Sequence, residues 1–171
     1  NYWVGPALMG VEPDELTDAV LGVMEACYNN DTFDGGLNRI ITDELHVYEE
    51  GVNVIPQTML LNYGDPKVVK RLMRTAKEYD RITGINDRGE RQIKSTFYGG
   101  SKIFSEGVWA KAKVYSNLIL QPGYSLVEFN GHPSAKKLIL EVADGLTALA
   151  KTDERGVTYL PEEIFFPSGE D

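Results

Sequence analysis

Apolar and polar residues follow the period of amphipathic helices along most of this chain. From Glu44 to Leu60, apolar residues recur at roughly helical spacing, and the segment Asn62–Pro66 then predicts a sharp turn. Asp65 is a good helix N-cap, and Pro66 suits a first helical position. A second apolar stripe follows, made of Val69, Leu72, Met73, Ala76 and Tyr79. The pattern predicts two helices joined by a short turn, which is a helical hairpin.

The same plan recurs later in the chain. A helix is predicted from about Tyr115 to Phe129, and the turn Asn130–Pro133 follows it. The stripe of the next helix is Ile139, Leu140, Ala143 and Leu146. A third copy is predicted near the N-terminus, where a turn at residues 10–13 precedes Leu16, Ala19, Val20, Val23 and Ala26. Three copies indicate an internal repeat. The alternative is a chance similarity between amphipathic helices.

Proline interrupts the first helix of two predicted pairs, at Pro56 and at Pro122. Proline removes one helical hydrogen bond, and its ring clashes with the preceding turn. We therefore expect each first helix to kink at its proline or to begin there.

Long connectors, residues 29–43 and 83–110, separate the predicted pairs. Loops of this length in a compact domain are usually functional or disordered. In the second connector, the runs 91–98 and 101–104 flank Gly99-Gly100, which is typical of a β-hairpin.

The predicted fold is therefore mainly α, with tandem antiparallel helical hairpins and a small β-hairpin insertion. We expect one domain over residues 1–171, with the β-hairpin in the loop 83–106.

Composition narrows the function. The 171 residues carry 17 Lys+Arg and 26 Asp+Glu, a formal net charge of -9. This balance argues against binding to a nucleic-acid backbone, and no apolar run is long enough for a membrane span. A lone cysteine, Cys27, forms no internal disulfide, so the compartment stays open. No nucleotide-binding or Cys/His metal motif is present, and we expect no cofactor and no metal.

The connectors indicate where chemistry is to be expected. If the short turns share one face, the long connectors share the other with the start of each first helix, and binding residues concentrate on such loops. The residues there are His46, Tyr48, Glu49, Asn53, Trp109, Lys111, Tyr115 and Gln121, with Arg91, Tyr98 and Lys102 from the hairpin. Aromatic rings, amides and charged groups together suit sugar recognition. The alternative is that the rings pack in the core and the charges form a solvated rim.

Two proton-transfer arrangements are open. His46 is a candidate general base, because an unperturbed histidine titrates near neutral pH; the alternative is a surface or capping histidine. Glu49, Glu50 and Asp34 are candidates for the paired acids of glycoside hydrolysis. Neighbouring glutamates on a helix point about 100° apart, so at most one of the two faces a cleft.

Tandem hairpins with short turns on one side and long connectors on the other resemble the (α/α) toroid enzymes, which include polysaccharide lyases and six-hairpin glycosidases. The resemblance covers roughly residues 5–150 and rests on architecture. It implies a ring of more hairpins than this chain provides, so we expect the chain to be part of a larger toroid.

For the lyases, the resemblance implies that Asn53 and Arg91 neutralise a uronate carboxylate, that His46 is the base and that Tyr98 or Tyr115 is the acid. It implies a sugar platform at Trp109. The other substrate-binding candidates are Tyr48, Glu49, Lys102, Lys111 and Gln121.

The leading hypothesis is a lyase that cleaves an acidic polysaccharide by β-elimination, secreted or periplasmic, with a cytoplasmic location left open. A cluster of cations in the second connector favours an anionic substrate: Arg91, Lys94, Lys102, Lys111 and Lys113. The alternatives are a toroid glycoside hydrolase and a non-catalytic helical-repeat scaffold that binds protein.

Overall fold

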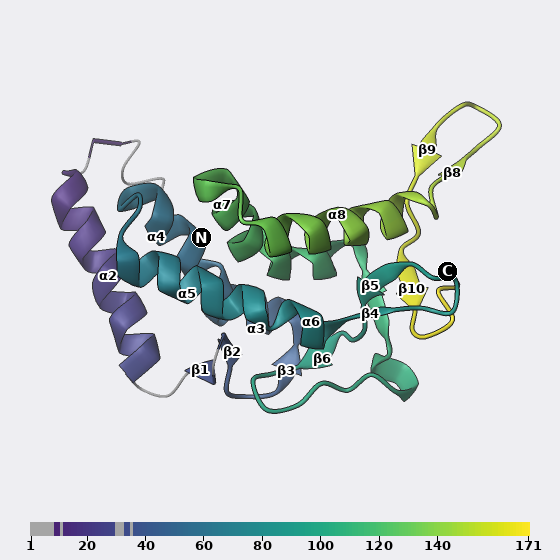
Figure 1. Ribbon diagram of the computed structural model, residues 1–171, viewed down its shortest axis with the longest axis horizontal. Coiled ribbons are helices and arrows are strands. Elements are labelled where there is room, and N and C mark those ends of the chain that lie inside the picture. The colour runs from purple at the N-terminus through teal and green to yellow at the C-terminus, as the bar shows by residue number, and fades with distance from the viewer. Residues whose placement is uncertain (1–8, 11, 30–32, 35) are drawn as a thin grey trace.

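The computed structural model describes residues 9–10, 12–29, 33–34 and 36–171 (Figure 1). About half of the chain is helical, and the described strands form two-stranded antiparallel sheets. The prediction of helices with small β elements is confirmed at this level. The described helices do not close into a toroid.

The helices run along the chain in the order α2 (Pro13–Asn29), α3 (Glu44–Val47), α4 (Val54–Leu61), α5 (Pro66–Lys77), α6 (Tyr79–Ile82), α7 (Gln121–Asn130) and α8 (Pro133–Thr147). A π-helical turn, η1 (Tyr48–Val52), joins α3 to α4, and two 3-10 helices precede α7: η2 (Gly107–Trp109) and η3 (Val114–Leu120).

The strands pair as β1 (Phe33–Asp34) with β2 (Leu37–Asn38), β3 (Thr42–Asp43) with β6 (Phe97–Tyr98), β4 (Thr83–Ile85) with β5 (Arg91–Ile93), β7 (Lys111–Lys113) with β10 (Glu163–Phe165), and β8 (Lys151–Thr152) with β9 (Thr158–Tyr159).

Two of the predicted hairpins are present, α4 with α5 and α7 with α8. The carboxylate of Asp65 caps α5 by accepting the backbone N–H groups of Lys67 at 2.7 Å and Val68 at 3.2 Å. In the second turn, Nδ1 of His132 accepts the backbone N–H of Ala135 at 3.3 Å. Both turns therefore satisfy free N–H groups at the start of the following helix.

Pro56 and Pro122 also act as predicted. α4 begins two residues before Pro56, after the π-helical turn, and α7 begins one residue before Pro122, after η3. Each α-helix thus starts near its proline, where the missing N–H breaks no internal helical bond.

The predicted apolar stripes are confirmed at Leu72, Tyr79 and Ile139, which are buried, and wrong at other positions. On α5, Val68 and Leu72 are buried, whereas Met73 is 40% exposed. On α8, Leu138 and Val142 are buried, whereas Leu140 is 52% exposed. In both helices the buried face therefore lies about one residue earlier than predicted.

The predicted N-terminal stripe is wrong. Leu16 is buried, but Ala19, Val23 and Ala26 are exposed. Leu21 instead packs against the core between the hairpins. The Val20 side chain and the first helix expected before this turn lie outside the described residues.

The second connector forms its hairpin in a shorter version. Tyr98 bridges Ile103 across the predicted Gly-Gly turn, and the Gly99 N–H donates to the Lys102 carbonyl at 2.9 Å. The expectation of one strand over 91–98 is wrong, because β5 ends at Ile93 and pairs with β4 instead.

Two apolar cores hold the helices together. One lies where the helices meet the β segments and contains Tyr79, Ile93, Tyr98, Ile119 and Leu138 among others. The second lies between the hairpins and consists of Ile55, Met59, Val68, Leu72 and Leu126. α7 packs against both α5 and α8, and Figure 1 shows α5 and α8 spread along the length of the molecule.

Candidate functional site

Three segments that are distant in sequence meet at the start of the two first helices. β3 pairs with β6 so that Thr42 lies opposite Tyr98 and Asp43 opposite Phe97. The helix that follows β3, α3, contacts η3. The helix starts and the long connector therefore gather at one place, as the sequence predicts.

A π-helical turn contributes Tyr48 to this junction. The Asn53 N–H donates to the Tyr48 carbonyl at 3.1 Å, which is a bond across five residues. Such turns are rare and frequently lie at functional sites. The Tyr48 hydroxyl donates to Oε1 of Gln121 at 2.9 Å. Two predicted binding residues from different hairpins are thus in direct contact.

Asp43 orients His46 at this junction. Its carboxylate caps α3 by accepting the backbone N–H groups of Leu45 and His46, each at 3.1 Å. The other carboxylate oxygen lies 2.5 Å from Nδ1 of His46. Burial raises the pKa of Asp43, but the hydrogen bonds from His46 outweigh it and leave that pKa below the ordinary value. His46 is therefore exposed and oriented by a carboxylate.

Behind this surface lies a buried carboxyl, Glu44. Its side chain is buried, and Oε2 has no hydrogen-bond partner among the described residues. Burial raises the pKa of Glu44 to about 7, against the attraction of Lys113. The Tyr98 phenol is fully buried and also lacks a hydrogen-bond partner, and burial followed by the charge of Glu44 raises its pKa. Glu44 is thus a group that changes charge near neutral pH inside the fold.

A shallow groove of about 580 Å³ opens over η3 and the start of α7. Its lining consists of Val114, Tyr115, Asn117, Leu118, Gln121 and Tyr124. The Tyr115 side chain is 39% exposed and that of Tyr124 is 49% exposed. The groove therefore offers two aromatic rings and two amides to a ligand, next to Tyr48.

Lys113 stands at the edge of the groove. Its Nζ lies 5.5 Å from the centroid of the Tyr115 ring and 3.4 Å from Oε1 of Glu163. Hydrogen bonding with Tyr115, and then with Glu163, raises the pKa of Lys113. This lysine is therefore a cation at neutral pH that contacts an exposed phenol.

Other predicted residues lie away from the groove. Arg91 points toward α8, where its Nε donates to Oε2 of Glu141 at 2.7 Å. Lys102 lies over the Phe104 ring beyond the Gly-Gly turn. Trp109 stacks on Phe97 with ring centroids 4.7 Å apart.

The remaining candidates are placed as follows. Lys111 donates to both carboxylate oxygens of Glu163 at 2.8 Å. Asn53 is buried, and Glu49 is exposed on the π-helical turn. The side chains of Glu50 and Asp34 lie outside the described residues.

The expectation of one cleft shared by His46, Tyr98 and Tyr115 is wrong. Tyr98 has no exposed surface, since it belongs to the larger core. Tyr115 lines the groove, whereas His46 lies on the exposed side of α3. The roles expected for these residues stay predictions. Of the predicted residues that the structure describes, Tyr115 and Gln121 line the groove, and the buried Tyr48 is hydrogen-bonded to Gln121.

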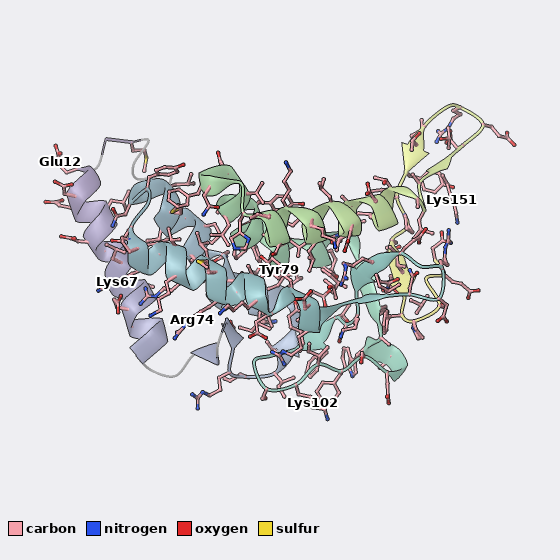
Figure 2. The ribbon with its side chains drawn as sticks, viewed as in Figure 1. Glu12, Lys67, Arg74, Tyr79, Lys102 and Lys151 are labelled. Carbon is pink, nitrogen blue, oxygen red and sulfur yellow. The ribbon has the colours of Figure 1, made fainter. Side chains whose placement is uncertain are left out.

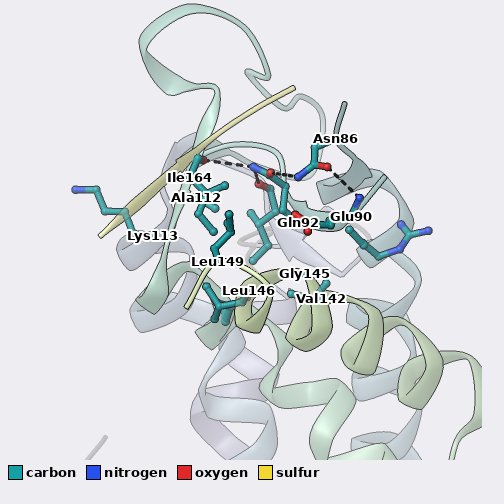
Figure 3. A pocket seen from close by; sticks show the side chains of 13 residues that line it. Asn86, Glu90, Gln92, Ala112, Lys113, Val142, Gly145, Leu146, Leu149 and Ile164 are labelled. Carbon is teal, nitrogen blue, oxygen red and sulfur yellow. Dashed lines mark hydrogen bonds between the residues drawn. The ribbon is translucent and has the colours of Figure 1, made fainter. Parts of the chain in front are cut away.

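A more enclosed pocket lies between β5 and α8 (Figure 3). It holds about 10 Å³, roughly the space of one water molecule. The Asn86 amide donates to Oε1 of Gln92 at 2.8 Å, and the Gln92 amide donates to the Ile164 carbonyl at 3.3 Å. This pocket lies beside a chain of amide hydrogen bonds that links the strands, and it is too small for a sugar.

Sequence reasoning missed Glu44 and Tyr124. No signal in the sequence distinguishes the buried Glu44 from the exposed acids around it. Tyr124 could have been predicted from the sequence, because Leu118, Gln121 and Tyr124 recur every three residues and so share a helical face.

Among the described residues, no three His, Cys, Asp or Glu side chains are grouped so that they could hold a metal ion. Nor does the described part of the chain contain a helix long and apolar enough to span a membrane. No protein-family model, curated protein or solved structure matches this chain.

Proposed function

We propose that this chain is part of a carbohydrate-active enzyme of the (α/α) toroid type, and that the groove over η3 and α7 binds an acidic polysaccharide. The groove carries this proposal: its exposed rings suit the apolar faces of sugar rings, and its amides suit hydroxyl groups. The two hairpins then correspond to neighbouring segments of a larger ring.

The proposed reaction is β-elimination from a uronate. This reaction needs a cation near the carboxylate, because the C5 proton is weakly acidic until developing charge is stabilised. Lys113 supplies that cation at the edge of the groove. Tyr115, as a phenolate beside Lys113, takes the proton from C5 and returns it to the glycosidic oxygen on C4, so that the C4–O bond breaks as the C4–C5 double bond forms.

The test uses purified protein and a panel of uronate polymers. Elimination creates a conjugated double bond, so ultraviolet absorbance rises as the product forms. The Tyr115→Phe variant is expected to lose at least tenfold in rate while it still binds polymer, because the ring remains. Reducing sugar released without that absorbance selects the toroid hydrolase instead.

Binding is tested separately with Tyr124→Ala. We expect at least fivefold weaker binding of the polymer, since a stacking ring is lost. Tyr159→Ala is the matched control, because Tyr159 is 51% exposed on β9 and does not line the groove. Equal binding by both variants would remove the groove from the proposal.

A helical-repeat scaffold that binds protein is the second candidate. It is favoured by the apolar part of the groove, where Val114 and Leu118 lie beside the two tyrosine rings. For this function, the variants His46→Ala, Tyr98→Phe and Tyr115→Phe are expected to bind the protein partner as the wild type does, provided that each variant folds.

A further inference from the structure

In this acidic chain, all the charged residues of helix α5 are basic. The 12 residues of α5, Pro66–Lys77, include Lys67, Lys70, Arg71, Arg74 and Lys77, and no acid. Val68, Leu72 and Thr75 bury the other side of the helix. The cations are therefore held on one outward surface by the packing of α5 on its neighbours.

Four of these cations line a hollow of about 360 Å³ between α2 and α5, together with Glu25. Figure 2 shows Lys67 and Arg74 along this side of α5, beside the C-terminal half of α2, and Glu12 at the opposite end of that helix. The acidic start of α2 is thus remote from the hollow.

Among the described residues that line the hollow, Glu25 is the single acid, and it does not balance the four cations. Oε1 of Glu25 accepts from Nη2 of Arg71 at 2.7 Å and lies 4.0 Å from Nζ of Lys67. Lys70 and Arg74 have no ion-pair partner among the described residues. Counted over the described lining residues, four cations and one carboxylate give a net charge of three positive charges.

This arrangement opposes the stability of the helix. Lys67, Lys70, Arg71 and Arg74 stand three or four residues apart, where like charges repel. Lys67 also lies in the first turn, at the positive end of the helix dipole. A bound anion relieves both repulsions.

We infer that this basic face of α5 is an anion-binding site for an acidic polysaccharide strand, separate from the groove over η3 and α7. Ammonium and guanidinium groups along two turns match carboxylates or sulfates on successive sugars. None of the described residues that line the hollow is aromatic, so these residues offer no platform for stacked nucleic-acid bases. The inference goes beyond the proposed function, because it needs neither the groove nor a reaction.

The test is the salt dependence of binding to a sulfated or uronate polysaccharide. The variant Lys70→Gln/Arg74→Gln is expected to bind at least tenfold more weakly, with a logarithmic salt slope smaller by about two. Arg71 is left in place because it anchors Glu25 of α2. Lys136→Gln/Lys137→Gln on α8 has the same change in net charge and is expected to bind like the wild type.

Circular dichroism checks that both double variants are folded. Equal weakening by the two variants would overturn the inference, since net charge alone would then explain binding. Equally tight, salt-dependent binding of duplex DNA would also overturn it, because the partner would not be a glycan. Loss of binding by Tyr124→Ala with full binding by Lys70→Gln/Arg74→Gln would leave the groove as the glycan site and overturn the α5 site.

Discussion

The backbone N–H of Gly123 donates to the hydroxyl oxygen of Tyr79 at 2.8 Å, inside the core. Tyr79 lies at the start of α6 and Gly123 in the first turn of α7, so this bond joins the two hairpins. A Cβ at position 123 would lie 2.7 Å from Cε2 of Tyr79 and 3.0 Å from Cδ1 of Ile139. The close approach of the two helices therefore requires glycine here.

Tyr79→Phe is expected to lower the free energy of unfolding by about 1–3 kcal/mol, because it leaves a buried N–H without an acceptor. Gly123→Ala is expected to cost about 1–3 kcal/mol through overpacking. Urea denaturation measures both. Tyr63→Phe, on an exposed ring, is the control and should stay within about 0.5 kcal/mol of the wild type.

Glu44 predicts a dependence of stability on pH. Its pKa is about 7 in the folded protein, against an ordinary 4.5. The folded state thus binds the proton on Glu44 more tightly than the unfolded state does. The stabilisation of the folded protein by this proton is complete below pH 4.5 and is lost as the pH rises through about 7. The loss is at most about 3 kcal/mol. Glu44→Gln should remove this slope, and a variant with the wild-type slope between pH 4.5 and 8 would contradict the assignment.

The two turn caps should differ in strength. Asp65→Ala is expected to cost about 1 kcal/mol of unfolding free energy, because the carboxylate accepts two N–H groups. His132→Ala should cost less, because its single bond to Ala135 is 3.3 Å long. Thermal unfolding of both variants checks the order, and a larger loss for His132→Ala would contradict it.

The contact of Tyr48 with Gln121 is measurable as a coupling energy. A double-mutant cycle with Tyr48→Phe and Gln121→Met is expected to give about 1 kcal/mol. Additive effects of the two substitutions would mean that the hydrogen bond does not help to join the hairpins.

The turns were predictable because their chemistry is local. Asp65 followed by Pro66 favours the start of a helix through local chemistry alone, and Pro133 at the second turn acts in the same way. The exact buried face was less predictable. Val68 rather than Met73 is buried because the neighbouring helices decide which side of α5 faces the core. The two residues flank opposite edges of the apolar stripe, so a modest rotation of the helix about its axis exchanges them.

Strand partners and buried faces were only partly predictable from the sequence pattern. β5 pairs with β4 across a turn at residues 86–90, and this partner was not recognised in the 83–106 loop. For Tyr98, alternation fixes which residues share a face but does not say which face is buried. The cations of α5 were visible in the sequence, but only the position of α2 shows that they line a hollow.

The described strands belong to sheets of two, so most of them have an edge that no other strand covers; β6 is an exception, because Tyr98 also bridges Ile103. Open edges invite pairing with other chains, and longer sheets protect them with charges, bulges or covering helices. Here the strands are two or three residues long, and each leaves very few free N–H and C=O groups. The shortness of the strands therefore protects the protein against edge-to-edge aggregation, and substitutions that lengthen β8 and β9 would remove this protection.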